Sequence, residues 1–204
     1  MAPANLVHVI DDDEAIRESL TFLLSTVGLD VRSYESATAF LAALPATRAG
    51  CIVTDVRMPG ISGVELLHRL RELGVGMPVI VMTGHGDVQL AVEAMKIGAR
   101  DFIEKPFDDE TLLRAVRAAL DDSERQAQHD AERIALLERF AGLTNRERDV
   151  LQGLVAGKPN KIVAFDLGIS PRTVEIYRAN VMTKMQASSL SELVRMAIAA
   201  GLAD

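Results

Sequence analysis

Acidic side chains and one lysine follow short apolar segments at several points of this chain. Asp55 closes one apolar run, Asp11 and Asp12 follow another, and Lys105 comes after a third. Carboxylates suit Mg²⁺, which needs only one or two of them beside its waters. A carboxylate oxygen can also attack phosphorus as a nucleophile, and a lysine ammonium can neutralise phosphoryl oxygens. The set predicts a site for a divalent cation and a phosphoryl group, centred on Asp55.

Each group has an expected part in this chemistry. Asp12 and Asp55 are the expected direct ligands of Mg²⁺ or Mn²⁺, with Asp11 nearby, and the backbone carbonyl of Arg57 completes the protein's share. The hydroxyl of Thr83, at the end of a further apolar run, is expected to approach the same phosphoryl group. Taken singly, an aspartate at such a place is more often a turn former or a helix cap. The combination favours a pocket.

Residues 1–122 alternate short apolar runs with helical patterns, which predicts an α/β fold. The expected strands are 6–10, 30–34, 51–54, 78–82 and 101–103. The expected helices are 14–27, 36–44, 63–73, 87–97 and 108–121. Five consecutive βα units indicate a parallel sheet with helices on both faces. Such sheets bind ligands at the carboxyl edge of their strands, which is where the acidic groups and the lysine are expected to meet.

Some local features of this half remain open or have an ordinary explanation. Either Asp12 or Asp13 is suited to cap the helix that begins near residue 14. The Lys105-Pro106 bond is expected to be cis and to aim the lysine inward. Cys51 lies within an apolar run, so we expect it to be a small core residue.

Composition and charge indicate a water-soluble chain of two parts. The chain of 204 residues is 49% hydrophobic and 25% charged, and no apolar stretch is long enough to span a bilayer. We therefore expect a cytoplasmic protein. Residues 1–122 hold 11 Lys/Arg and 19 Asp/Glu, whereas residues 143–204 hold 8 and 6. An acidic first part and a mildly basic last part suggest different partners.

Residues 123–204 have a purely helical pattern. Residues 123–142 contain many helix formers and read as a solvated helical linker, although a flexible polar tether remains an alternative. The expected helices of the last part are 144–156, 160–167, 171–185 and 189–200. Thr144 and Glu147 have the spacing of a capping box, and Ser170 precedes a proline at a helix start. The pattern predicts a four-helix module separate from the first domain.

The helices 160–167 and 171–185 have the size and spacing of a helix–turn–helix. Ile162, Val163, Ala164 and Leu167 are expected to pack inward in the first helix, and Val174, Val181 and Met185 in the second. The opposite faces carry the candidate DNA contacts Asn160, Lys161, Arg172, Thr173, Glu175, Tyr177, Arg178 and Lys184. Basic and hydroxyl side chains can bind phosphates, and an arginine can read guanine. A small helical bundle with a solvated charged face is the alternative.

Several motifs of the first domain resemble the signature of two-component receiver domains. They are Val9-Ile10-Asp11-Asp12-Asp13-Glu14, Val53-Thr54-Asp55-Val56-Arg57-Met58-Pro59-Gly60, Thr83-Gly84 and Phe102-Ile103-Glu104-Lys105-Pro106. The resemblance implies a flavodoxin-like five-stranded parallel sheet in residues 1–122 and Asp55 as phosphoacceptor. It implies a partner sensor histidine kinase as donor, and Thr83 and Phe102 as the switch pair. Phe102 has no hydroxyl, so it cannot make the hydrogen bond that a tyrosine would.

The last part resembles a LuxR/FixJ/NarL-type helix–turn–helix domain. The resemblance rests on the segments 143–147, 157–161 and 169–178 and spans residues 143–204 as a DNA-binding domain. It departs from the family at two positions. Tyr177 stands where the family commonly has histidine, and Val163 replaces a small alanine in the support helix. The first change keeps a hydrogen-bonding tip, and the second indicates an adjustment of packing.

The whole chain most closely resembles the FixJ group of response regulators, particularly over residues 82–107. The resemblance implies a transcription activator that is switched by phosphorylation, dimerises when phosphorylated, and acts on promoter DNA with RNA polymerase. It also implies a kinase of the FixL type and nitrogen-fixation or microaerobic target genes. FixJ-group regulators of other pathways are an alternative.

Two rival classes have specific requirements that this sequence does not meet. A phosphatase of the haloacid-dehalogenase type would need a second aspartate at position 57, where the chain has arginine. A stand-alone receiver would have no helix–turn–helix. We therefore expect no enzyme activity beyond self-phosphorylation from a phosphodonor and self-dephosphorylation.

Overall fold

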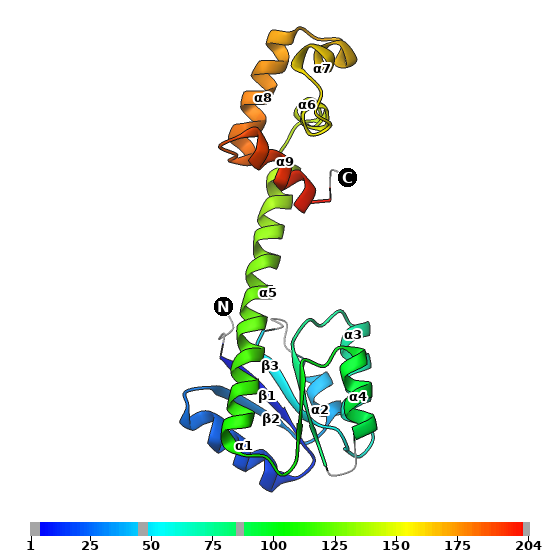
Figure 1. The fold of residues 1–204 in the computed structure, drawn as a ribbon, viewed down its shortest axis with the longest axis vertical. Helices are drawn as coiled ribbons and strands as arrows, with labels where there is room; N and C mark the ends of the chain where they lie inside the picture. Colours follow the sequence, from blue (N-terminus) through cyan, green and yellow to red (C-terminus); the bar gives the residue numbers. More distant parts are fainter. Residues whose placement is uncertain (1–4, 45–48, 85–87, 202–204) are drawn as a thin grey trace. The chain divides into compact units, whose positions relative to one another are not determined.

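The computed structural model describes residues 5–44, 49–84 and 88–201 (Figure 1). The chain divides into two compact units, Met1–Ala127 and Gln128–Asp204. The start of the expected helix 87–97 lies outside the described residues. Within the described residues, no helix combines the length and the apolar character needed to cross a membrane.

The first unit contains a five-stranded parallel sheet with the order β2-β1-β3-β4-β5. Its strands are β1 (Leu6–Ile10), β2 (Asp30–Tyr34), β3 (Cys51–Asp55), β4 (Val79–Thr83) and β5 (Asp101–Glu104). This order is that of the flavodoxin-like fold, in which ligands bind where the strand order reverses. Each strand agrees with its predicted range to within one residue, so the predicted fold class is confirmed.

Five helices cover the two faces of this sheet. They are α1 (Glu14–Thr26), α2 (Ala37–Ala42), α3 (Gly63–Glu72), α4 (Val88–Ile97) and α5 (Asp109–Ala141). Figure 1 shows α1 and the start of α5 on one face and α2, α3 and α4 on the other. In β4, Val79 and Val81 face α3 and α4, whereas Ile80 and Met82 face α1 and α5. Successive side chains of the strand thus point to opposite faces, and the sheet is buried on both of them.

The helix α5 contains 33 residues and runs without interruption from Asp109 to Ala141. Residues 123–141, which were expected to form a helical linker, are helical in this structure. The boundary between the two compact units, after Ala127, falls inside this helix. No glycine or proline interrupts residues 109–141, which is consistent with an unbroken helix.

The second unit is built from the end of α5 and four further helices. These are α6 (Asn145–Val155), α7 (Asn160–Leu167), α8 (Pro171–Met185) and α9 (Leu190–Ala199). Thr144 and Glu147 form the predicted capping box, and Ser170 caps α8 by accepting from the N–H of Thr173. Val174, Val181 and Met185 are buried, as predicted. The prediction for Ile162 is wrong, because its side chain is 48% exposed.

Candidate functional site

The carboxyl edge of the sheet brings the predicted acidic groups and the lysine together. Lys105 lies just after β5, and its Nζ donates to Asp55 Oδ1 at 2.5 Å and to Asp11 Oδ2 at 3.1 Å. The Asp11 side chain is almost fully buried, and Asp55 is 9% exposed. The Lys105-Pro106 bond is cis, as expected. Three strand ends that are distant in the sequence thus meet within hydrogen-bonding distance.

The backbone fixes the two carboxylates from the other side. The N–H of Arg57 donates to Asp55 Oδ2 at 2.7 Å, and the N–H of Asp13 donates to Asp11 Oδ1 at 2.9 Å. Asp13 itself caps α1, since its Oδ1 accepts from the N–H groups of the first turn. Of the two capping candidates, Asp13 is therefore the cap. Asp12, which lies between Asp11 and Asp13 in the chain, is exposed.

Burial and pairing act in opposite directions on the charges of this site. Burial raises the pKa of Asp11, and the hydrogen bonds from Asp13 and Lys105 oppose this rise. Burial lowers the pKa of Lys105, but its hydrogen bonds to Asp55 and Asp11 outweigh burial, so the pKa is raised overall. The lysine therefore remains a cation that balances the carboxylates.

Thr83 and Phe102 differ in how far they are exposed. Thr83 closes β4 and is buried, and its carbonyl accepts from the N–H of Lys105 at 2.7 Å. This bond holds the threonine beside the lysine at the sheet edge. Phe102 lies in β5, one strand further out, and its side chain is 46% exposed. The ring of Phe102 is therefore partly open to solvent in this structure, whereas the threonine is not.

Two residues at this edge were not predicted from the sequence. Arg17 on α1 donates through Nη1 to the carbonyls of Asp11 and Asp12 at 2.8 and 3.0 Å, so it holds the acidic loop in place. Gly63 begins α3, where an added Cβ would lie 2.3 Å from the carbonyl oxygen of Asp55. Only glycine allows that close approach. Nothing in the sequence distinguished Arg17 from other arginines. A glycine at the start of a helix, as at position 63, does indicate tight packing of the backbone.

The donor set fits a hard divalent cation that keeps most of its waters. Within the described residues there is no cluster of three or more His, Cys, Asp or Glu side chains arranged to hold a metal. Mg²⁺ does not require one, because two carboxylates, a carbonyl and waters are enough. In this structure the Lys105 ammonium contacts Asp11 and Asp55, and Asp12, next to Asp11 in the chain, is exposed. An ion there would share these carboxylates with the lysine.

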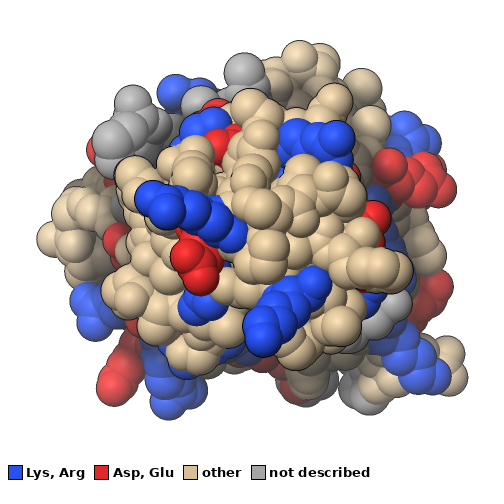
Figure 2. Space-filling view, turned by 90° about the horizontal axis from the view of Figure 1, so that it is seen from above, with Lys and Arg blue, Asp and Glu red and all other residues tan. Residues whose placement is uncertain are grey.

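The second unit presents its candidate DNA contacts on α7 and α8. Lys161, Arg172 and Glu175 are exposed, and Asn160, Thr173 and Arg178 are partly exposed. Figure 2, which looks onto this end of the chain, shows Lys and Arg side chains scattered over a mostly uncharged surface. Such a surface can bind phosphates through a few cations and read bases through polar and apolar contacts.

Two of the predicted contacts are instead engaged within the module. The Nζ of Lys184 donates to Glu147 Oε2 at 2.7 Å, and this carboxylate is buried. The hydrogen bonds from Lys184 and Thr144 lower the pKa of Glu147. Tyr177 is partly buried against the core of the module. A contact to DNA would have to compete with these interactions, most strongly at Lys184.

Sequence reasoning missed one candidate on the recognition helix, because it considered only polar side chains. Ile176 lies between Glu175 and Tyr177 on α8, and its side chain is 56% exposed. An apolar side chain at such a place can contact the methyl group of thymine. The sequence did contain a signal for this residue, because Ile176 is apolar and yet does not belong to the inward-facing stripe of α8.

Comparisons with known proteins cover both units. Residues 7–117 match the family described as "Response regulator receiver domain", and residues 141–197 match "Bacterial regulatory proteins, luxR family". The chain is 64% identical over 198 residues to the transcriptional regulatory protein FixJ of Azorhizobium caulinodans, covering 97% of this chain and 93% of that protein. It is 52% identical over 195 residues to FixJ of Rhizobium meliloti, covering 96% of each.

Solved structures show the same similarity. The structure of the response regulator StyR has a TM-score of 0.85 at 39% identity, covering 95% of this chain and 98% of that one. Full-length FixJ from B. japonicum has a TM-score of 0.60 at 52% identity, covering 98% of both chains.

Proposed function

Because this chain belongs to the FixJ-like response regulators, with a receiver domain and a luxR-family DNA-binding domain, we propose that phosphorylation of Asp55 switches it as a transcription activator. The observation that supports this most directly is the contact of Lys105 Nζ with both Asp55 and Asp11 at the carboxyl edge of the sheet. In this proposal residues 1–122 form the receiver, 123–142 the helical linker and 143–204 the DNA-binding domain.

Asp55 acts as the nucleophile of the phosphoryl transfer. Its carboxylate attacks phosphorus on a phosphohistidine of a partner sensor histidine kinase, the phosphorus–nitrogen bond breaks, and an acyl phosphate remains on Asp55. The carboxylates of Asp11, Asp12 and Asp55 and the carbonyl of Arg57 would hold Mg²⁺ or Mn²⁺. That ion would supply neutralisation of the phosphoryl oxygens. Lys105 is already within 2.5 Å of Asp55 Oδ1 and can pair with the new phosphoryl group.

Thr83 and Phe102 carry the signal away from the site. The Thr83 hydroxyl would donate to a phosphoryl oxygen, and the ring of Phe102, now 46% exposed, would turn inward. This movement changes the surface formed by α4, β5 and α5, which would then form a homodimer. The phosphoryl group adds roughly one to two negative charges, which supply the free energy for the change.

The DNA-binding domain inserts α8 into the major groove. Arg178 and Glu175 are the side chains that would reach base edges, while Asn160, Lys161, Arg172 and Thr173 would position the helix on phosphates. Lys184 and Tyr177 contribute less, because they are engaged within the module. In a dimer the two recognition helices would lie about 34 Å apart, which matches a site with two half-sites.

The names of the relatives support a proposal for the pathway and the partners. Because the similar proteins are named FixJ, we propose nitrogen-fixation or microaerobic genes as targets and a kinase of the FixL type as partner. A FixJ-like regulator of another pathway is the alternative. RNA polymerase would be the further partner at the promoter, and the protein would act in the cytoplasm.

The proposal is tested by DNA binding and sedimentation with acetyl phosphate and Mg²⁺. The wild type is expected to dimerise and to bind promoter DNA more tightly, and Asp55→Asn is expected to do neither. Asp30→Asn, an exposed aspartate at the start of β2, is the matched control and should behave as the wild type. If Asp55→Asn still dimerises in response to acetyl phosphate, Asp55 is not the phosphoacceptor.

The contacts with DNA need a separate experiment. Arg178→Ala is expected to weaken binding and relax the preference for one base pair, at a cost of about 1–3 kcal/mol. Arg172→Ala should weaken binding to all sequences and reduce the dependence on salt. Equal effects of both variants on specific and random DNA would contradict the assignment of Arg178 to a base.

A further inference from the structure

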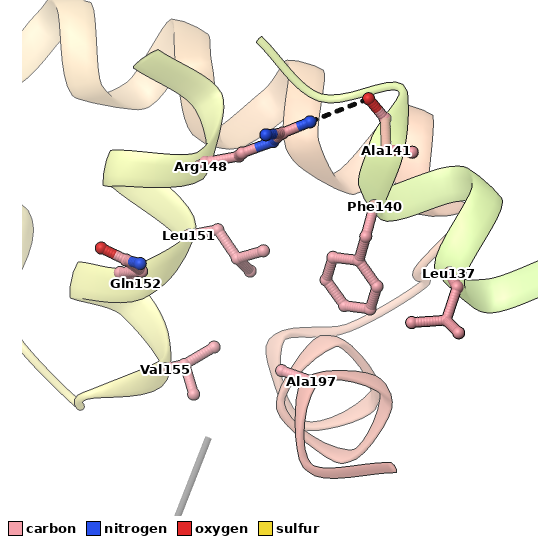
Figure 3. Close-up of a pocket in the computed structure, with 8 residues that line it drawn as sticks. All are labelled: Leu137, Phe140, Ala141, Arg148, Leu151, Gln152, Val155 and Ala197. Carbon is pink, nitrogen blue, oxygen red and sulfur yellow. Dashed lines mark hydrogen bonds between the residues drawn. The ribbon is translucent and has the colours of Figure 1, made fainter. Parts of the chain in front are cut away.

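The second unit contains an apolar cavity that the proposed function does not use. The cavity has a volume of about 320 Å³ and lies where the end of α5 meets α6 and α9. Figure 3 shows Phe140 from α5, Leu151 and Val155 from α6, and Ala197 from α9 around it. Phe140, Leu151 and Ala197 are buried, so the cavity extends into the core of the module.

The size and lining of the cavity suit a small molecule. Ligand sites in proteins span roughly 300–1,000 Å³ and are lined mostly by apolar side chains with a few polar groups. A dry apolar cavity of about 150 Å³ in another protein already binds benzene. The volume here is sufficient for one aromatic ring that carries a short chain.

Arg148 gives the cavity its charge. Its Nη2 donates to the carbonyl oxygen of Ala141 at 2.9 Å, which holds the guanidinium at the rim, as Figure 3 shows. A guanidinium has five N–H donors in a fixed fork, and this bond uses one of them. No acidic side chain is among the described residues that line the cavity. The backbone carbonyls at the end of α5 carry partial negative charge, which disfavours an anion at the rim. The positive charge of Arg148 offsets this effect, so the rim as a whole favours an anion.

We propose that this cavity binds a small carboxylic acid with a single aromatic ring or an aliphatic body of similar size. The acid group pairs with Arg148, and the ring lies among Phe140, Leu151 and Val155. A carboxylate accepts from a guanidinium through short, charge-assisted hydrogen bonds, and a ring gains from the apolar lining. The cavity belongs entirely to the second unit, so it gives the DNA-binding module a chemical input that does not depend on Asp55.

The test uses the full-length protein and two probes of the same shape and opposite charge, 4-phenylbutyrate and 4-phenylbutan-1-amine. Calorimetry is expected to show one saturable site for the acid with a Kd of roughly 1 mM or tighter. The amine is expected to bind at least tenfold more weakly. In methyl NMR spectra, the acid should shift the resonances of Leu151 and Val155.

Two pairs of variants, one pair on α9 and one on α6, distinguish binding in the cavity from binding at the surface. Ala197→Leu fills the cavity and should abolish binding of the acid, whereas Ala199→Leu, at an exposed position of α9, should leave it unchanged. Arg148→Met should weaken binding of the acid at least tenfold without weakening binding of the amine. Arg146→Met, which removes an exposed arginine two residues earlier on α6, is its control.

Three results would overturn the proposal. One is the absence of saturable binding of the acid to the wild type. Another is equal binding of acid and amine, which would remove the role of Arg148. The third is a self-association of the wild type that Ala197→Leu abolishes and the acid does not affect, because the occupant of the cavity would then be a second copy of the chain.

Discussion

Replacing Lys105 by methionine would leave two carboxylates facing each other without their cation. The lysine Nζ lies 2.5 Å from Asp55 Oδ1 and 3.1 Å from Asp11 Oδ2, so these oxygens are no more than about 5.6 Å apart. At an effective dielectric constant of about 20, their repulsion at that distance is about 3 kcal/mol. Removing one partner of a buried ion pair costs about 3–5 kcal/mol. Because the Lys105 side chain is 23% exposed, we expect a loss near 3 kcal/mol.

Magnesium should reverse much of this loss. In the variant the carboxylates no longer contact the ammonium, so Mg²⁺ is expected to bind at least tenfold more tightly than to the wild type. A tenfold gain in affinity corresponds to about 1.4 kcal/mol, which appears as added stability when the ion is in excess. The stabilisation by Mg²⁺ should therefore be larger in Lys105→Met than in the wild type.

Hydrogen exchange of the β3 amides is the appropriate assay, because it reports on the first unit alone. The protection of residues 52–55 would be measured with chelator and with Mg²⁺ for the wild type and for Lys105→Met. Lys96→Met, at an exposed position in the last turn of α4, serves as the control and should cost less than about 1 kcal/mol. The reasoning is refuted if Lys105→Met matches the wild type in chelator, or if Mg²⁺ stabilises both equally.

Three further perturbations test other parts of the structure. Gly63→Ala places a Cβ 2.3 Å from the carbonyl oxygen of Asp55 and should cost about 3 kcal/mol or more in urea unfolding, whereas Gly76→Ala, with no atom within 4 Å, should be nearly neutral. Burial lowers the pKa of His8 below 6.5. The unfolded chain therefore binds a proton that the folded chain resists, so stability should fall as the pH drops below about 6.5, and less so in His8→Phe. Lys184→Met should destabilise the second unit by roughly 1–2 kcal/mol in thermal unfolding, and an unchanged melting temperature would show that its ion pair contributes nothing.

The fold was predictable because its signals are local and repeated. Each strand is a short apolar run followed by a turn, and the alternation of strands with helices permits few arrangements of the sheet. The candidate site was predictable for the same reason. Residues that follow parallel strands share one edge, so Asp11, Asp55, Thr83 and Lys105 had to be neighbours.

Other features depend on how side chains pack, which spacing does not determine. Residues 162–165 of α7 are all apolar, so no periodicity distinguishes the buried Val163 from Ile162 and Phe165, which are 48% and 84% exposed. Lys184 was placed on the DNA face because it is charged. Its Nζ also contacts Glu147, 37 residues earlier, and only the folded module brings these two groups together.

The contact between α6 and α7 joins Gly153 and Val163, one position from each helix. A Cβ added at Gly153 would lie 2.7 Å from a methyl group of Val163, so the space that glycine leaves open is the space that valine fills. The side-chain volume of Val163 is accommodated because Gly153 has no side chain. Residues 153 and 163 are therefore expected to change together during evolution. A smaller residue at 163 leaves room for a larger one at 153. Either change alone is expected to be destabilising, because it leaves a void or creates a clash.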